Sequence, residues 1–129
     1  MVINYKTKEL IYMTVNIYDN ANEMAIVLKE TQQYVAWQSA FDAIQNDNEA
    51  KTLFTEFQSI QMAVQQMMQS QQQPNPEQEK AWDEVAARVQ KNDLITVLLS
   101  AEQALNTLLT ELNDIVTKPV ADAYATLRP

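Results

Sequence analysis

The 129-residue sequence contains no glycine, no cysteine and no histidine. Without glycine, tight left-handed turns and phosphate-cradling loops lose the residue they usually need. Without histidine and cysteine, the commonest proton shuttle, the soft metal ligands and the thiolate nucleophile are missing. No pairing of the remaining polar residues has the spacing of a nucleophile and its base. We therefore expect no enzymatic activity and no cofactor.

Basic residues are also scarce, with nine Lys and Arg against seventeen Asp and Glu, which gives a formal net charge of −8. A nucleic-acid-binding protein normally needs a basic stripe that displaces counterions from phosphates. Direct binding of DNA, RNA or an anionic membrane surface is therefore not expected. Solubility explains the acidity, and an acidic docking surface for a basic partner is the alternative. The absence of cysteine fits a reducing cytoplasm, which is the expected location.

The chain does contain apolar residues that recur at alternating steps of three and four, the spacing of helices that pack along one another. No strand-like alternation occurs, and no apolar run is long enough to cross a membrane. The sequence therefore predicts an all-α fold. We expect residues 1–13 to be a disordered or alternative-start extension and residues 14–129 to form a single helical domain.

Capping signals predict two short helices near the N-terminus. Asn20 and Glu23 have the spacing of a capping box, so the first helix is expected to begin after Asn20. Thr31 can interrupt this helix and cap a second one, which is expected to end near Gln45.

A long antiparallel hairpin is predicted in the middle of the chain. Asn46 is the expected cap of a helix over 48–70, and a proline-containing linker separates this helix from another over 77–91. The short linker indicates that the two helices pack side by side. Glu84 and Arg88 are four residues apart on the second of them and are expected to form an ion pair.

The last helix is predicted over 94–117. The dipeptide Lys118-Pro119 is expected to end or kink it, because proline removes a helical hydrogen bond and clashes with the preceding turn. A short helical turn is then expected within 120–127.

Two apolar seams lie on these long helices, and we predict that the chain self-associates through them. The first seam comprises Leu53, Phe57, Ile60, Val64 and Met67. The second seam comprises Leu98, Leu105, Leu109, Leu112 and Val116. Because the chain has little else to cover both seams, a pairing of hairpins about a two-fold axis is expected, giving a homodimer or a tetramer.

Three residues near the seams are candidates for a more specific role. Glu102 is the one charge on the second seam and is expected to lean to its edge and pair with a basic or polar group, because an unpaired buried charge is very unfavourable. A buried acid that selects a partner is the alternative. Met62 and Met68 lie off the first seam, where they belong either to the packing or to a partner interface.

Clustered carboxylates raise the possibility of metal binding. The clusters are Glu77, Glu79, Asp83 and Glu84, and on the last helix Glu111 and Asp114. A di-metal helical bundle needs inward carboxylates and Glu-x-x-His pairs, whereas these acids lie mostly off the apolar stripes. Solvated helix faces are the favoured interpretation, and a metal- or small-ligand-binding helical bundle is kept as the alternative function.

Two stretches of the sequence carry a likeness to known proteins. The first stretch comprises Tyr34 to Ile44, Ala50-Lys51, Leu53-Phe54, Phe57 and Gln61. The second comprises Ala101-Glu102-Gln103, Leu105, Leu108-Leu109, Glu111-Leu112-Asn113, Ile115 and Lys118-Pro119. In their order and spacing, these residues resemble the YlbF/YmcA/YheA-like family of small bacterial helical proteins. The likeness extends from about Val15 to Leu127 and is greatest to the YheA-like branch.

The resemblance implies an all-α fold in which a long helical hairpin drives self-association, and a cytoplasmic, non-catalytic role. The YlbF and YmcA relatives regulate competence, biofilm formation and sporulation through a multiprotein complex that influences an RNA-degrading endonuclease. Some of them carry cysteines implicated in iron–sulfur cluster binding, a property that this cysteine-free chain cannot share. We expect an adaptor-like interaction or regulatory protein.

Overall fold

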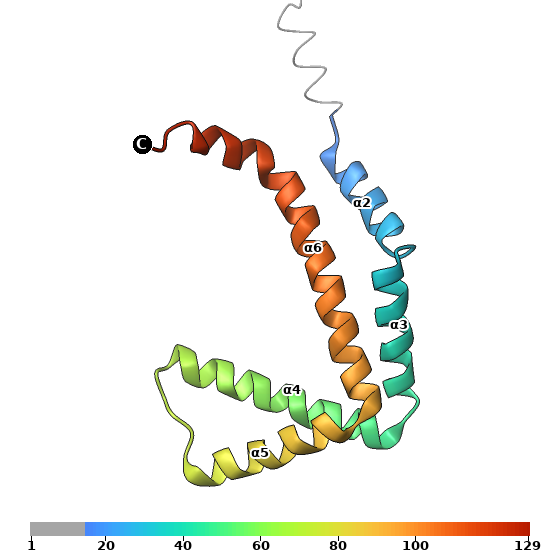
Figure 1. The fold of residues 1–129 in the computed structure, drawn as a ribbon, viewed down its shortest axis with the longest axis vertical. Coiled ribbons are helices and arrows are strands. Elements are labelled where there is room, and N and C mark those ends of the chain that lie inside the picture. Colours follow the sequence, from blue (N-terminus) through green and yellow to red (C-terminus); the bar gives the residue numbers. More distant parts are fainter. Residues whose placement is uncertain (1–14) are drawn as a thin grey trace, which may run out of the picture.

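The computed structural model describes residues 15–129, which form five α-helices and no strand within that range (Figure 1). The helices are α2 (Ile17–Leu28), α3 (Gln32–Gln45), α4 (Asn48–Gln69), α5 (Pro76–Lys91) and α6 (Asp93–Ala125). The all-α prediction is confirmed. The predicted extension over residues 1–13 lies outside the described residues, and the single domain over 14–129 stays a prediction.

The helices form two arms that diverge from a common junction (Figure 1). One arm is the predicted antiparallel hairpin of α4 and α5. The other arm consists of α6 with α3 packed along its N-terminal half, and α2 continues beyond α3. The last helix therefore pairs mainly with α3 and contacts the hairpin only near the junction.

The hydrophobic core lies where α3, α4, α5 and α6 meet. Each of these helices contributes two buried apolar residues from the end nearest the junction: Ala40 and Ile44, Ala50 and Leu53, Val85 and Val89, Ile95 and Leu98. Aromatic residues of α3 and α4 pack against this core. Further out along either arm, no described residue is buried, so the junction is the part that apolar burial stabilises most.

One predicted helix start is wrong by a few residues, and one predicted cap is wrong by one residue. The first helix begins at Ile17, and Asn16 caps it by accepting hydrogen bonds from the amides of Tyr18 and Asp19 at 3.0 and 3.3 Å. Near this start the Asn-x-x-acid pattern occurs at both Asn16 and Asn20, and the helix begins at the upstream copy because that adds one more hydrogen-bonded turn.

The cap of α4 is Asp47 and not Asn46. The Asp47 carboxylate accepts from the amide of Ala50 at 2.9 Å, while Asn46 caps the C-terminal end of α3. Thr31 caps α3, as predicted, by accepting from the amide of Tyr34 at 3.2 Å. Asparagine and aspartate are both good caps, so only the path of the chain between α3 and α4 decides which of these two adjacent residues caps α4.

The end of α4 shows how a chain without glycine makes a helix stop. Gln71 adopts a left-handed backbone conformation with φ of 57°. The amide of Gln72 donates to the carbonyl of Met67 at 2.8 Å, and the amide of Gln71 donates to that of Met68 at 3.4 Å. This is a Schellman motif, in which glycine is the usual left-handed residue. Glutamine carries a Cβ atom, so this position is strained.

The last helix continues past its predicted end at residue 117. Pro119 lies inside α6, which extends to Ala125, and Lys118 pairs with Asp122 across one turn at 2.7 Å. The ribbon of α6 bends in its last part (Figure 1), as expected where proline interrupts the hydrogen-bond ladder. Of the two predicted effects of Pro119, a kink is therefore the correct one, and most of the turn predicted within 120–127 is part of the same helix.

Candidate interaction surface

The first seam lies along α4 and is used largely inside the chain. Leu53 is buried, and Phe57, Ile60 and Met67 are half-buried. The facing surface is provided by α5, through Val85, Val89 and half-buried Trp82. Only Val64, at 36% exposure, is open to solvent. The hairpin thus covers much of the first seam without a second molecule.

The second seam lies along α6 and is covered only at its inner end. Leu98 is buried, Leu105 and Leu112 are half-buried, and Leu109 and Val116 are 41% and 58% exposed. The covering helix is α3, which also carries an aromatic row. In that row Tyr34 and Trp37 have ring centroids 5.5 Å apart, and Trp37 and Phe41 have centroids 5.4 Å apart. Beyond Leu112, every residue of α6 is exposed.

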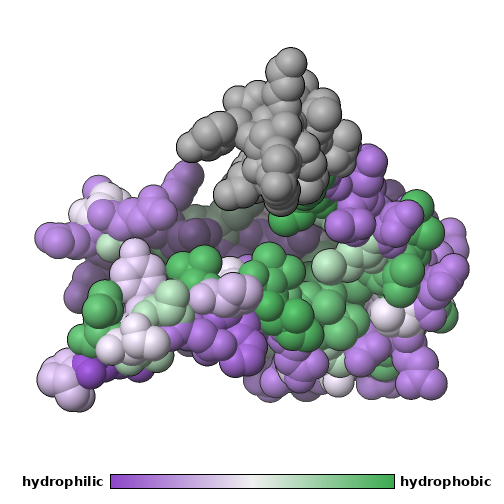
Figure 2. Space-filling model, turned by 90° about the horizontal axis from the view of Figure 1, so that it is seen from above, coloured by the Kyte–Doolittle hydropathy of each residue, from purple (hydrophilic) through white to green (hydrophobic). Residues whose placement is uncertain are grey.

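The outer parts of both arms therefore present apolar side chains to solvent. The large apolar residues exposed there include Ile17, Met24, Ile26 and Val27 of α2, Met62, Val64 and Met68 of α4, and Leu109, Ile115, Val116, Val120 and Tyr124 of α6. Seen from above, hydrophobic residues gather in a broken band bordered by hydrophilic ones (Figure 2). Such surfaces mark interaction sites in soluble proteins.

A further apolar stripe on α4 was missed by the sequence analysis. It consists of Phe54, Phe57, Gln61, Val64 and Met68, and we call it the lateral stripe. Its steps of three, four, three and four are those of a helix that packs beside another. It shares Phe57 and Val64 with the first seam, and the same spacing shifted by one residue would have revealed it. Met68 thus belongs to a continuous stripe, whereas Met62 lies on another face of α4 beside Gln65, Gln66 and Gln69.

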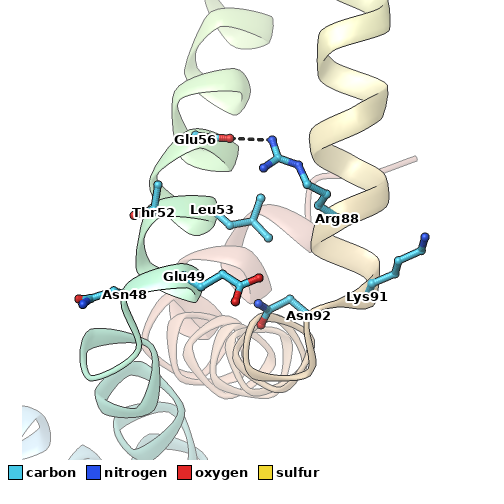
Figure 3. A pocket seen from close by; sticks show the side chains of 8 residues that line it. All are labelled: Asn48, Glu49, Thr52, Leu53, Glu56, Arg88, Lys91 and Asn92. Carbon is cyan, nitrogen blue, oxygen red and sulfur yellow. Dashed lines mark hydrogen bonds and ion pairs between the residues drawn. The ribbon is translucent and has the colours of Figure 1, made fainter.

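A polar hollow of about 530 Å³ lies between α4 and α5 next to the junction (Figure 3). Arg88 of α5 and Glu56 of α4 point toward each other across it and form an ion pair of 2.9 Å. The predicted partner of Arg88, Glu84, is therefore wrong, because the hairpin brings Glu56 to the guanidinium. Both side chains are about half exposed, so the pair contributes little to stability.

The other side chains that line this hollow have structural positions. Leu53 points between the two helices, and Lys91 points outward (Figure 3). The side chain of Asn92 accepts from the amide of Ile95 at 3.1 Å and so serves as the cap of α6. The pair of Arg88 and Glu56 thus links the two helices of the hairpin, and Asn92 fixes the start of α6 where the chain leaves α5.

Glu102 lies half-buried on the second seam. Burial raises the pKa of its carboxyl, because the charged form loses hydration. The predicted basic or polar partner is not found in residues 15–129, where Glu102 makes neither an ion pair nor a side-chain hydrogen bond. It borders an open hollow lined mainly by polar α6 residues, among them Asn106 and Thr110.

Residues 15–129 contain neither a candidate metal site nor a candidate membrane span. Between residues 15 and 129, no three His, Cys, Asp or Glu side chains come together in a way that could hold a metal ion. The predicted acidic clusters on α5 and α6 lie on exposed faces. None of the helices in this range combines the length and apolar character needed to cross a membrane.

Known proteins share both the sequence and the fold of this chain. The family model described as control of competence regulator ComK, YlbF/YmcA, matches residues 17–121. A UPF0342 protein of Leuconostoc citreum is 80% identical over 116 residues, which are 90% of this chain and 98% of that protein.

Two solved structures from Bacillus subtilis have similar folds. The structure of yheA superimposes with a TM-score of 0.64 at 26% identity, covering 85% of this chain and all (100%) of that one. RicA, solved in complex with RicF, superimposes with a TM-score of 0.63 at 18% identity, covering 86% of this chain and 98% of that one. At 18% identity, the second likeness concerns the fold alone.

Proposed function

This chain belongs to the YlbF/YmcA family, and we propose that it is a non-enzymatic, self-associating protein that regulates other proteins by binding them. The family's description is control of the competence regulator ComK. The resemblance seen in the sequence is thereby confirmed. The proposal places the protein in the cytoplasm and assigns it an adaptor-like role. A link to biofilm formation, sporulation and an RNA-degrading complex stays a prediction from the family.

The observation that carries the proposal is the pair of apolar surfaces left open on the outer arms. Val116 and Ile115 of α6 are 58% and 68% exposed, and Met68 of α4 is 74% exposed. Leaving such side chains in water forgoes about 25 cal/mol for each Å² of apolar surface. A partner molecule that covers them recovers that free energy, and RicA, which has the same fold, was solved in complex with another protein.

Self-association is tested by size-exclusion chromatography with light scattering across the micromolar range. We expect a species with two or four times the mass of one chain. A folded protein that stays monomeric over the whole range contradicts the self-association part of the proposal.

Binding to other proteins is tested by affinity capture from the native cell after chemical cross-linking. Wild type is compared with Val116→Glu, which places a charge on the open part of the second seam, and with Thr110→Glu on a polar face of the same helix. We expect defined partners with wild type and Thr110→Glu and their loss with Val116→Glu. Equal capture by all three proteins, or no capture by any of them, contradicts an adaptor role through this surface.

The alternative function is a metal- or small-ligand-binding bundle, for which residues 15–129 contain no candidate metal cluster. Elemental analysis and a thermal-shift screen of the purified protein test it. Stoichiometric metal, or a large ligand-dependent rise in melting temperature, would replace the proposal.

A further inference from the structure

The lateral stripe of α4 begins in the core and runs out into solvent. Phe54 and Phe57 are half-buried against the junction, with ring centroids 6.4 Å apart. Further along, Gln61 is exposed, Val64 is 36% exposed and Met68 is 74% exposed. Since α5 covers the first seam, the outer half of the lateral stripe has no covering helix in the described part of the chain. Its heptad spacing fits one more helix alongside α4.

The lack of charged residues on the outer half of α4 indicates which molecule supplies that additional helix. No residue between Glu56 and Glu77 is charged, although the chain is 20% charged and carries a net charge of −8. A surface made for a foreign partner is usually selected by complementary charges, and like charges brought together are strongly unfavourable. Because the chain carries a net charge of −8, a surface without charged residues avoids the repulsion between two identical acidic copies. The outer half of α4 is such a surface, so it fits a second copy of this chain.

The open surface of α6 is unsuitable for the same purpose. From Asp93 to Thr117, its charged residues are Asp93, Glu102, Glu111 and Asp114, all acidic. Glu102 lies half-buried on the second seam itself. Pairing two copies through this seam would bring two carboxylates together in a poorly hydrated interface. The second seam is therefore left for other proteins.

Gln61 lies in the middle of the lateral stripe and suits a two-fold axis. An amide side chain both donates and accepts hydrogen bonds, so it can pair with its own counterpart. Among the helices of residues 15–129, α3, α5 and α6 surround the inner end of α4, whereas α5 alone lies beside its outer end (Figure 1). An antiparallel pair avoids a collision between the two junctions and aligns the helix dipoles favourably.

We propose that two copies of this chain associate by packing the lateral stripes of their α4 helices against each other, antiparallel, with Gln61 close to the two-fold axis. The inference rests on the self-association proposed above and specifies the surface that mediates it.

A cross-linking experiment locates the interface. Because the chain has no cysteine, single-cysteine variants react at one position only. Gln61→Cys and the α6 control Val116→Cys are each treated with a short bis-maleimide at micromolar concentration and analysed on a denaturing gel. We expect a covalent dimer with Gln61→Cys and none with Val116→Cys. A protein that is dimeric by light scattering but cross-links only at residue 116 overturns this interface and leaves self-association standing, whereas a monomer overturns both.

A charge substitution tests the same interface without altering side-chain shape. Gln61→Glu places two carboxylates near the axis, and Gln66→Glu places the same charge on the other exposed face of α4. We expect the dimer dissociation constant, measured by sedimentation equilibrium at neutral pH, to rise about tenfold or more for Gln61→Glu and to change little for Gln66→Glu. Acidification should restore association of Gln61→Glu as its carboxylate is protonated. Equal dissociation constants for the two variants at neutral pH overturn the inference.

Discussion

The junction and the outer arms are built from the same kinds of apolar residue but differ in how many helices cover them. At the junction, four helix ends enclose Ile95 and Leu98, which are 0% and 1% exposed. On the outer part of α6, Ile115 and Val116 continue the apolar character of the helix and are 68% and 58% exposed. A helix alone can show which of its faces is apolar, but the number of neighbours decides how much that face stabilises the fold.

The comparison is tested most directly by removing the same atoms from both regions. Ile95→Ala is expected to lower the free energy of unfolding by about 2–5 kcal/mol, because it leaves a cavity among four helices. Ile115→Ala, its matched control, is expected to change it by less than about 0.5 kcal/mol. Urea unfolding followed by circular dichroism measures both, and equal losses would show that the outer arm is as well packed as the junction.

Helix caps at the two ends of α5 test whether the tip of the hairpin opens independently of the junction. Asn92→Ala removes the α6 cap at the junction and is expected to lower the free energy of unfolding by about 1 kcal/mol. Asn75→Ala removes the capping box at the hairpin tip, where Asn75 accepts from the amide of Gln78 at 2.8 Å. Its global effect should be smaller, because the tip can open without disrupting the junction. Hydrogen exchange would then report faster opening confined to the tip, and loss of protection throughout the chain would contradict independent opening.

The left-handed residue after α4 offers a stabilising change in the outer region. Gln71→Gly is expected to raise the free energy of unfolding by about 0.5–1 kcal/mol, because glycine adopts this conformation without a Cβ clash. Gln71→Ala keeps the Cβ atom and should give no such gain. A destabilised Gln71→Gly variant would mean that contacts of the glutamine side chain stabilise the fold by more than its backbone strain destabilises it.

The smallest effect concerns Glu102, between the covered and open parts of α6. Its raised pKa in the folded protein means that the carboxyl favours folding most below its ordinary pKa, near 4, and that this contribution is lost as pH rises through the raised folded value. Glu102→Gln should therefore be more stable than wild type at neutral pH, and the difference should shrink on acidification. The exposed Glu111→Gln serves as the control. A difference between Glu102→Gln and wild type that stays constant with pH would contradict the burial of this carboxyl.

Local sequence patterns were sufficient for most helices and for some of their caps. Thr31 caps α3 as predicted. Asparagine is a favoured cap and proline a favoured first-turn residue, and Asn75 and Pro76 hold these positions in α5. The predicted hairpin is present because a short proline-containing linker separates two amphipathic segments. The cap predicted at Asn20 was misplaced because a start at Asn16 adds one more helical turn, and the cap predicted at Asn46 was misplaced because the chain path between α3 and α4 favours Asp47.

Sequence by itself determined where the helices lie, which of their faces are apolar and that the middle of the chain folds back on itself, because these properties depend on residues a few positions apart. Only the tertiary structure decided that α3 covers the inner part of α6, that Arg88 pairs with Glu56 instead of Glu84, and that α4 has a lateral stripe left open after α5 has packed. Periodic spacing reports a face that needs a neighbour, whereas the identity of that neighbour is set by packing between segments far apart in the chain.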